Sequence, residues 1–216
     1  MQKQKRVLGF IALVVCSSII ISGCTQTPSD QKPPSPETLE QILAKAETIK
    51  SVYYEINMSL ITNGTRMQNM MMKIWQETPY LKEEISQSTN NISTNLTIIK
   101  CPNGTYNYDF VQKKFIPVLN INLPQPFTGD VARDLLNNRT ITTLGNDTID
   151  GKKATVIQYS PHQTRNSTTK VWIWNEKGIP LKTYTTMEKE GIITALEYQY
   201  RNYTFSDIPD STFNLS

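Results

Sequence analysis

The residue with the clearest chemical role in this chain is Cys24, because of the segment that precedes it. Basic residues at the N-terminus are followed by an almost entirely apolar run, 7–21, and then by Ser22 and Gly23. The run is shorter than the roughly 20 residues that cross a bilayer, and it has the length of the hydrophobic region of a signal peptide. A thiol in this position can carry a lipid.

The order of these parts resembles the lipobox of prokaryotic lipoproteins. The resemblance implies that residues 1–23 are a signal peptide and that Cys24 is lipidated and anchors the mature chain. Residues 24–36 are rich in Ser, Thr, Gln and Pro and are expected to be a tether to a domain formed by residues 37–216. An uncleaved anchor helix and a plain secretory signal are the alternatives. All of them place the protein outside the cytoplasm, and we expect it on the extracytoplasmic face of the cell membrane.

No other pattern favours catalysis. His162 is the single histidine, and no serine elbow, zinc-ligand spacing or glycine-rich phosphate loop accompanies it. Cys101 is the one cysteine left in the expected domain, where we expect a buried small hydrophobe rather than a reactive thiol. The three methionines at 70–72 alternate faces of a predicted strand, so their sulfur atoms cannot converge on a metal. The sequence predicts a protein that is not an enzyme and has no cofactor or metal.

The charge balance excludes a further class of partner. Without the three basic residues of the N-terminus, the 22 Lys and Arg become 19, which equals the 19 Asp and Glu. No basic cluster remains that would bind nucleic acid or an anionic lipid surface. The expected contact with the membrane is therefore the lipid anchor alone.

Asn-x-Ser/Thr sequons, the acceptor pattern for N-glycosylation, occupy ten of the seventeen asparagines. In the strand-like segments around Asn57 and Asn95, the alternation of faces directs both asparagines away from their apolar neighbours. A composition rich in polar strand residues is the alternative explanation. With the lipobox, the sequons favour an archaeal cell-surface glycoprotein. The candidate glycosylation sites are Asn57, Asn63, Asn91, Asn95, Asn103, Asn138, Asn146, Asn166, Asn202 and Asn214.

Hydrophobic periodicity predicts the elements that position these residues. Apolar side chains recur every three or four residues over 36–50, which predicts one amphipathic helix. After Ser51 the period changes to two, and turn signals separate about eleven strands. A short helix is predicted within 127–138. The predicted strands are 52–62, 65–77, 80–87, 92–100, 105–110, 114–118, 140–148, 153–159, 170–175, 181–189 and 192–204.

The expected architecture is an α+β domain: a curled, unclosed antiparallel half-barrel with both helices over its concave face. Each strand has one apolar side, and the apolar sides face the concavity. If the helices leave space there, an apolar groove remains that can hold acyl chains. The candidate ligand-lining residues are Leu39, Ile42, Met58, Leu60, Met70, Met72, Ile74, Leu96, Ile98, Trp172, Trp174, Leu196 and Tyr198.

Several short segments, in this order, resemble the LolA/LppX superfamily of lipoprotein-sorting and lipid-carrying proteins. The first is the predicted helix that leads directly into the first strand. The others are residues 78–82, 103–109, 150–154, 171–174, 178–182 and 205–209, the last of which is followed by Phe213. The resemblance covers about 36–215. It implies a half-barrel that binds a lipid or the acyl chains of a lipoprotein. The lipobox departs from the soluble shuttles of this superfamily and is closer to its membrane-tethered LppX/LprG-like members.

Two functions remain open on these grounds. The first is a surface lipoprotein that binds a lipid or an acylated ligand, in lipoprotein sorting or lipid carriage. The second is a non-catalytic sensing or protein-interaction module of the envelope, with the same fold and a filled cavity. A continuous groove of a few hundred Å³ between helix and sheet would favour the first.

Overall fold

The computed structural model describes residues 37–89, 92–118, 135–137, 140–160 and 166–215. The expected signal peptide, the lipidation site Cys24 and the tether lie outside these residues, as do His162 and the sequons at Asn91 and Asn138. Residues 37–216 form one compact unit. Within the described ranges, no helix is long and apolar enough to cross a membrane.

The predicted N-terminal helix is present but short. It consists of α1, Leu39–Ala44, and a 3₁₀ turn, η1, Lys45–Thr48. A capping box starts it: the Thr38 hydroxyl accepts from the Gln41 N–H, and the Gln41 side chain accepts from the Thr38 N–H. Tightening of the last turn to 3₁₀ ends the α-helix earlier than its hydrophobic pattern suggests.

All eleven predicted strands form, with boundaries within three residues of those expected. They are β1 Ser51–Thr62, β2 Thr65–Glu77, β3 Tyr80–Thr89, β4 Ile92–Cys101, β5 Gly104–Asp109, β6 Lys114–Pro117, β7 Thr142–Ile149, β8 Lys152–Tyr159, β9 Ser167–Trp174, β10 Pro180–Lys189 and β11 Ile192–Thr204.

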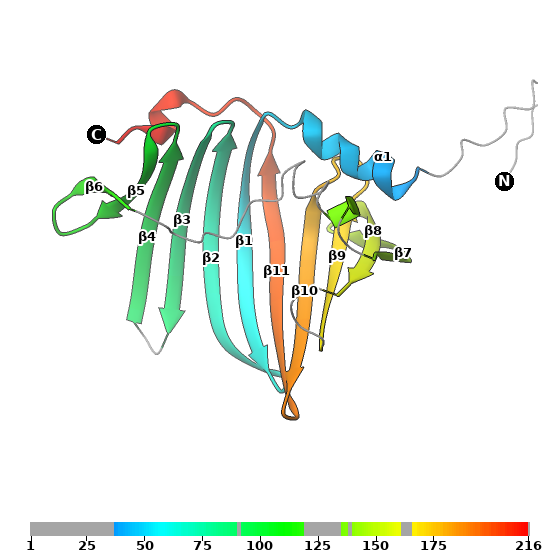
Figure 1. The fold of residues 1–216 in the computed structure, drawn as a ribbon. Coiled ribbons are helices and arrows are strands. Elements are labelled where there is room, and N and C mark those ends of the chain that lie inside the picture. Colours follow the sequence, from blue (N-terminus) through cyan, green and yellow to red (C-terminus); the bar gives the residue numbers. More distant parts are fainter. Residues whose placement is uncertain (1–36, 90–91, 119–134, 138–139, 161–165, 216) are drawn as a thin grey trace, which may run out of the picture. The chain divides into compact units, whose positions relative to one another are not determined.

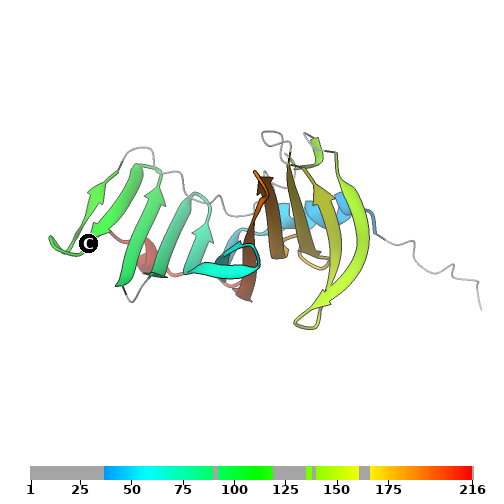
Figure 2. The ribbon, with the colours of Figure 1, turned by 90° about the horizontal axis from the view of Figure 1, so that it is seen from below.

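The strands make one antiparallel sheet in the order β6-β5-β4-β3-β2-β1-β11-β10-β9-β8-β7. Two meanders, β1–β6 and β7–β11, are joined where β1 pairs with β11. Because β6 and β7 lie at opposite edges, the sheet stays open, and it curls rather than lying flat (Figures 1 and 2). This is the α+β half-barrel that the sequence predicts.

Helix α1 packs on one side of this sheet, which we call the inner face. Ile42 and Leu43 are buried there against Ile157, Val171 and Ile173 of β8 and β9. Following the strand pairing from β8 and β9 through β10 and β11 to β1, a second buried cluster lies on the same face of the sheet, on β1 and β2. That cluster contains Val52, Tyr54, Ile56, Met72 and Ile74.

The predicted mid-chain helix lies mostly outside the described residues. Residues 135–137 are helical, and Leu135 is buried in the cluster that holds Ile42 and Leu43. This described turn therefore packs on the inner face beside α1, as the sequence predicts.

The opposite, outer face carries a small apolar cluster of its own. The C-terminal segment, with the 3₁₀ turn η2 at Asp210–Phe213, runs beside the sheet (Figure 2). Its Ile208 and Phe213 are buried together with Ile99 of β4. Trp75 and Phe115 pack against them. Part of the outer face is therefore shielded from solvent. The alternation of apolar and polar residues along the strands does not by itself predict this.

Candidate ligand-binding face

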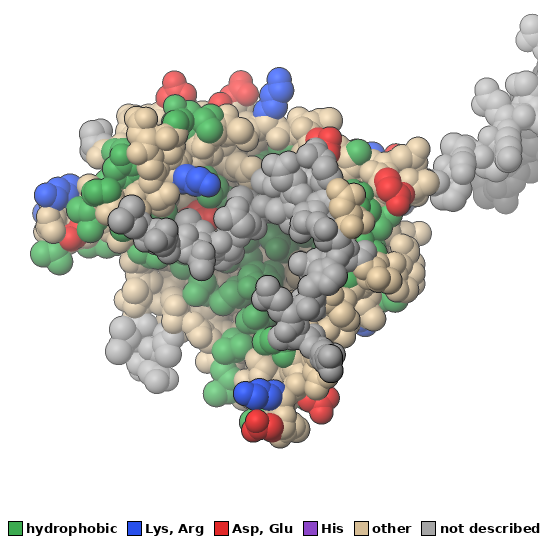
Figure 3. Space-filling model, viewed as in Figure 1, with side chains coloured by type: hydrophobic (Ala, Val, Ile, Leu, Met, Phe, Trp, Pro, Cys, Tyr) green, Lys and Arg blue, Asp and Glu red, His purple; other side chains and the backbone are tan. Residues whose placement is uncertain are grey.

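The inner face presents an apolar surface across β11, β1, β2, β3 and β4. Met58 lies directly across from Met70 on β2 and from Tyr198 on β11. In the next row, Ile56 lies across from Met72 and from Tyr200. Figure 3 shows hydrophobic side chains gathered over the middle of the molecule on the side viewed in Figure 1.

Eleven of the thirteen predicted lining residues belong to this face or to the helix that packs on it. Met72, Ile74 and Ile98 are each 1% exposed, whereas Met58 and Met70 are half-buried. Leu60, near the end of β1, lies directly across from Leu196, near the start of β11. The eleven are Leu39, Ile42, Met58, Leu60, Met70, Met72, Ile74, Leu96, Ile98, Leu196 and Tyr198.

Trp172 does not join them, which corrects the sequence prediction for that residue. Val171 and Ile173 take the inner positions of β9, so Trp172 points to the outer face, and its indole N–H donates to the Asp147 carboxylate at 2.9 Å. Trp174 lies at the end of the strand, packed on the rings of Tyr203 and Phe205. Period-two spacing places a pair on one face without saying which face it is.

Most of the described sequon asparagines are exposed. Of the eight described, Asn57 is half-buried, and the other seven are exposed. Asn57 and Asn95 both lie on the outer face, opposite the methionine-rich surface. Cys101, by contrast, is half-buried rather than buried as expected, and its Sγ contacts the Gly104 carbonyl at 3.6 Å.

Three polar residues on the inner face were missed by the sequence analysis: Tyr54, Glu83 and Asn107. Glu83 is 1% exposed and lies directly between Ile74 and Ile98 of the neighbouring strands. Burial raises the pKa of its carboxyl from 4.5 to about 7, because the charged form is desolvated there. Burial likewise raises the pKa of the Tyr54 hydroxyl well above 10. Glu83 lies two residues from both Leu81 and Ile85, which point to the inner face. This spacing could have shown from the sequence that Glu83 points to the inner face as well.

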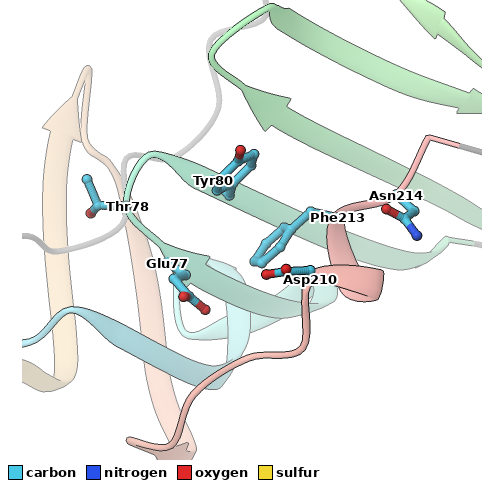
Figure 4. A pocket seen from close by; sticks show the side chains of 6 residues that line it. All are labelled: Glu77, Thr78, Tyr80, Asp210, Phe213 and Asn214. Carbon is cyan, nitrogen blue, oxygen red and sulfur yellow. The ribbon is translucent and has the colours of Figure 1, made fainter.

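Three hollows on the described surface lie away from the methionine-rich strands. One of about 290 Å³ lies between the β2–β3 turn and η2, where Tyr80 stacks on Phe213 (Figure 4). One of about 320 Å³ lies beside η1 and Trp174, and one of about 480 Å³ lies by Met187 and Ile193. None of the three is lined by the methionines or isoleucines of β1–β4. Among the described residues, no group of three or more His, Cys, Asp or Glu could hold a metal ion.

Comparison with solved structures finds this fold elsewhere. An uncharacterized conserved protein from Thermus thermophilus superposes with a TM-score of 0.51 at 7% identity, over 82% of this chain and 93% of that one. MucB gives 0.48 at 13% identity, over 82% and 62%, so this chain spans less than two thirds of the MucB chain. The lipoprotein LppX of Mycobacterium tuberculosis gives 0.45 at 10% identity, over 82% and 96%.

Structures described as a LolA superfamily protein and an outer-membrane lipoprotein-sorting domain are among the other matches. No protein-family model matches the sequence, and no curated protein matches it significantly. At these identities the likeness establishes the half-barrel fold. It gives no support to the archaeal origin that the sequons suggested.

Proposed function

We propose that this protein is a lipid-anchored envelope protein that binds a lipid or an acylated ligand on the inner face of its half-barrel. The observation that carries the proposal is the mainly apolar surface that Met58, Met70, Met72 and their neighbours build across β11, β1 and β2. Ile85 of β3 and Leu96 of β4 extend it. Methionine is flexible and polarisable, so such a wall adapts to acyl chains of different shape.

Extraction of the purified protein with organic solvent, followed by mass spectrometry, tests this function. We expect a lipid or acylated molecule in near-stoichiometric amount, released on denaturation and absent from a mock purification. Repeated extraction without any bound amphiphile would count against the proposal.

A charge placed on the inner face should abolish binding. Met70 is half-buried on that face, whereas Met71, next in the chain, is 45% exposed on the outer face. Met70→Asp buries an unpaired carboxylate and is expected to destabilise the fold by about 2–4 kcal/mol or to abolish uptake of a fluorescent fatty acid. Met71→Asp is the matched control and should stay within about 0.5 kcal/mol of the wild type. Equal behaviour of the two variants would show that the inner face is wet.

The anchor and the location follow from the N-terminal sequence. Lipidation of Cys24 would hold the mature chain on the extracytoplasmic face of the membrane, with residues 24–36 as the tether. Cys24→Ala is expected to move most of the protein from the membrane fraction to the soluble fraction, as measured by fractionation and immunoblotting. Unchanged membrane retention would contradict lipidation at this residue.

We also propose that the exposed sequons carry N-glycans on the outer face and the loops. Seven of the eight described sequon asparagines are exposed, which leaves room for an attached sugar. Enzymatic deglycosylation followed by intact-mass measurement should lower the mass of the native protein, and an unchanged mass would contradict the proposal.

A second function is favoured by one observation. Ile42 and Leu43 of α1 are 2% and 1% exposed, so the α1 end of the inner face is filled by packing. A filled face would suit a non-catalytic module that senses or binds a protein partner. The solvent extraction described above separates the two functions, because such a module would release no stoichiometric lipid.

A further inference from the structure

Four buried polar atoms in the described part of the chain have no hydrogen-bond partner. They are the Tyr54 hydroxyl oxygen, both carboxyl oxygens of Glu83 and Oδ1 of Asn107. Buried polar groups are paired in nearly all native structures, because an unpaired one has lost its hydrogen bonds to water without replacement. Each such atom calls for an explanation, and a ligand that supplies the missing partners is one.

All four atoms come from a single row across the inner face. From β1 to β5 the residues directly opposite one another are Tyr54, Ile74, Glu83, Ile98 and Asn107. Polar and isoleucine side chains alternate along this row. Neighbours in such a row are about 5 Å apart, so Glu83 lies about 10 Å from each of the other two polar residues.

Among the described residues, the row offers acceptors without matching donors. An ionised Glu83 and the Asn107 Oδ1 can only accept hydrogen bonds, and Tyr54 can do either. The nearest lysine on this face in the register, Lys100, lies across from Leu81, is exposed, and makes no bond to Glu83. A group that completes the row must therefore bring several N–H or O–H donors, and a positive charge would offset the lone carboxylate.

We propose that this row, centred on Glu83, binds the primary ammonium group of an amphiphile. An ammonium supplies three donors and the missing charge, whereas a polyol supplies donors alone. The next rows along the strands hold Ile56 with Met72 and then Met58 with Met70, so the acyl part can lie there. This inference rests on the proposed function and names the chemistry of its ligand.

Calorimetric titration at pH 8 with four dodecyl probes, each below its critical micelle concentration, tests the inference. The probes are dodecylammonium, dodecyltrimethylammonium, glycerol monolaurate and laurate. The wild type should bind dodecylammonium about tenfold or more tightly than each of the others, as expected for charge-assisted hydrogen bonds. Glu83→Gln should abolish this preference, so that dodecylammonium binds no more tightly than glycerol monolaurate.

Glu84→Gln is the matched control. Glu84 neighbours Glu83 in the chain but pairs with Lys82 on the outer face, so this variant should keep the full preference. Equal affinity for dodecylammonium and glycerol monolaurate, or a preference that survives Glu83→Gln, would overturn the inference. If none of the four probes binds, that result would instead overturn the proposed function, the binding of a lipid or acylated ligand on the inner face.

Discussion

The Glu83→Gln substitution should stabilise the ligand-free protein by about 2–3 kcal/mol at pH 8 and change its stability little at pH 4. The carboxyl is buried between Ile74 and Ile98 without a partner, and its pKa rises from 4.5 to about 7 on folding. Because the folded-state pKa is the higher one, the folded protein holds this proton more tightly than the unfolded chain does. The resulting stability is fully present below pH 4.5 and is lost as the pH rises through 7.

Urea unfolding at pH 4, 6 and 8 measures this effect. The wild type should lose about 3 kcal/mol from this group between pH 4.5 and pH 8, and Glu83→Gln should lack that loss. Glu84→Gln, on the outer face, should follow the wild type within about 0.5 kcal/mol, since exposed ion pairs contribute little. A Glu83→Gln variant that is less stable than the wild type at pH 8 would show that the carboxylate has a stabilising partner.

Gly178→Ala should destabilise the fold by about 2–4 kcal/mol through α1. Gly178 has a φ of +72° in the β9–β10 turn, and a Cβ there would collide with the Ile42 carbonyl oxygen and lie 3.0 Å from the Ala46 backbone nitrogen. Only a residue without a side chain lets the helix backbone approach so closely. Displacing α1 would also expose Ile42 and Leu43, which are buried against the sheet.

Gly191→Ala is the control that separates the steric clash expected at Gly178 from the backbone strain of a positive φ. Gly191 has nearly the same φ, +76°, but nothing lies within 4 Å of an added Cβ. This variant should therefore lose only about 1 kcal/mol. Thermal and urea unfolding of both variants give the comparison, and equal losses would mean that α1 does not pack on this turn.

Most of the fold could be predicted from local patterns. Turn pairs such as Asn63-Gly64 and Glu190-Gly191 take left-handed backbone angles, which is why they marked the hairpins. The alternation of Ile56 and Met58 with Asn57 identified the inner face of β1, because a packed face tolerates few polar residues. The length of α1 was predicted less well, since its final turn is 3₁₀.

The candidate site was predicted only where a face is uniformly apolar. The outward direction of Trp172 depends on Val171 and Ile173, whose burial against α1 is a tertiary contact. The role of Glu83 was hidden because a charged residue in a strand is normally solvated, and only the register shows it between Ile74 and Ile98. The outer cluster joins Ile99 to Ile208 and Phe213, which lie more than a hundred residues further along the chain. Hydrophobic periodicity describes single elements and does not predict such a long-range contact.

Photo-crosslinking with a diazirine-bearing fatty acid, followed by peptide mapping, tests most directly whether the ligand lies on the inner face. We expect the label on inner residues of β1 and β2, such as Met58, Met70 and Met72, and we expect unlabelled fatty acid to compete for these positions. Labelling confined to outer residues such as Met71 or Trp172, or insensitive to competition, would contradict it.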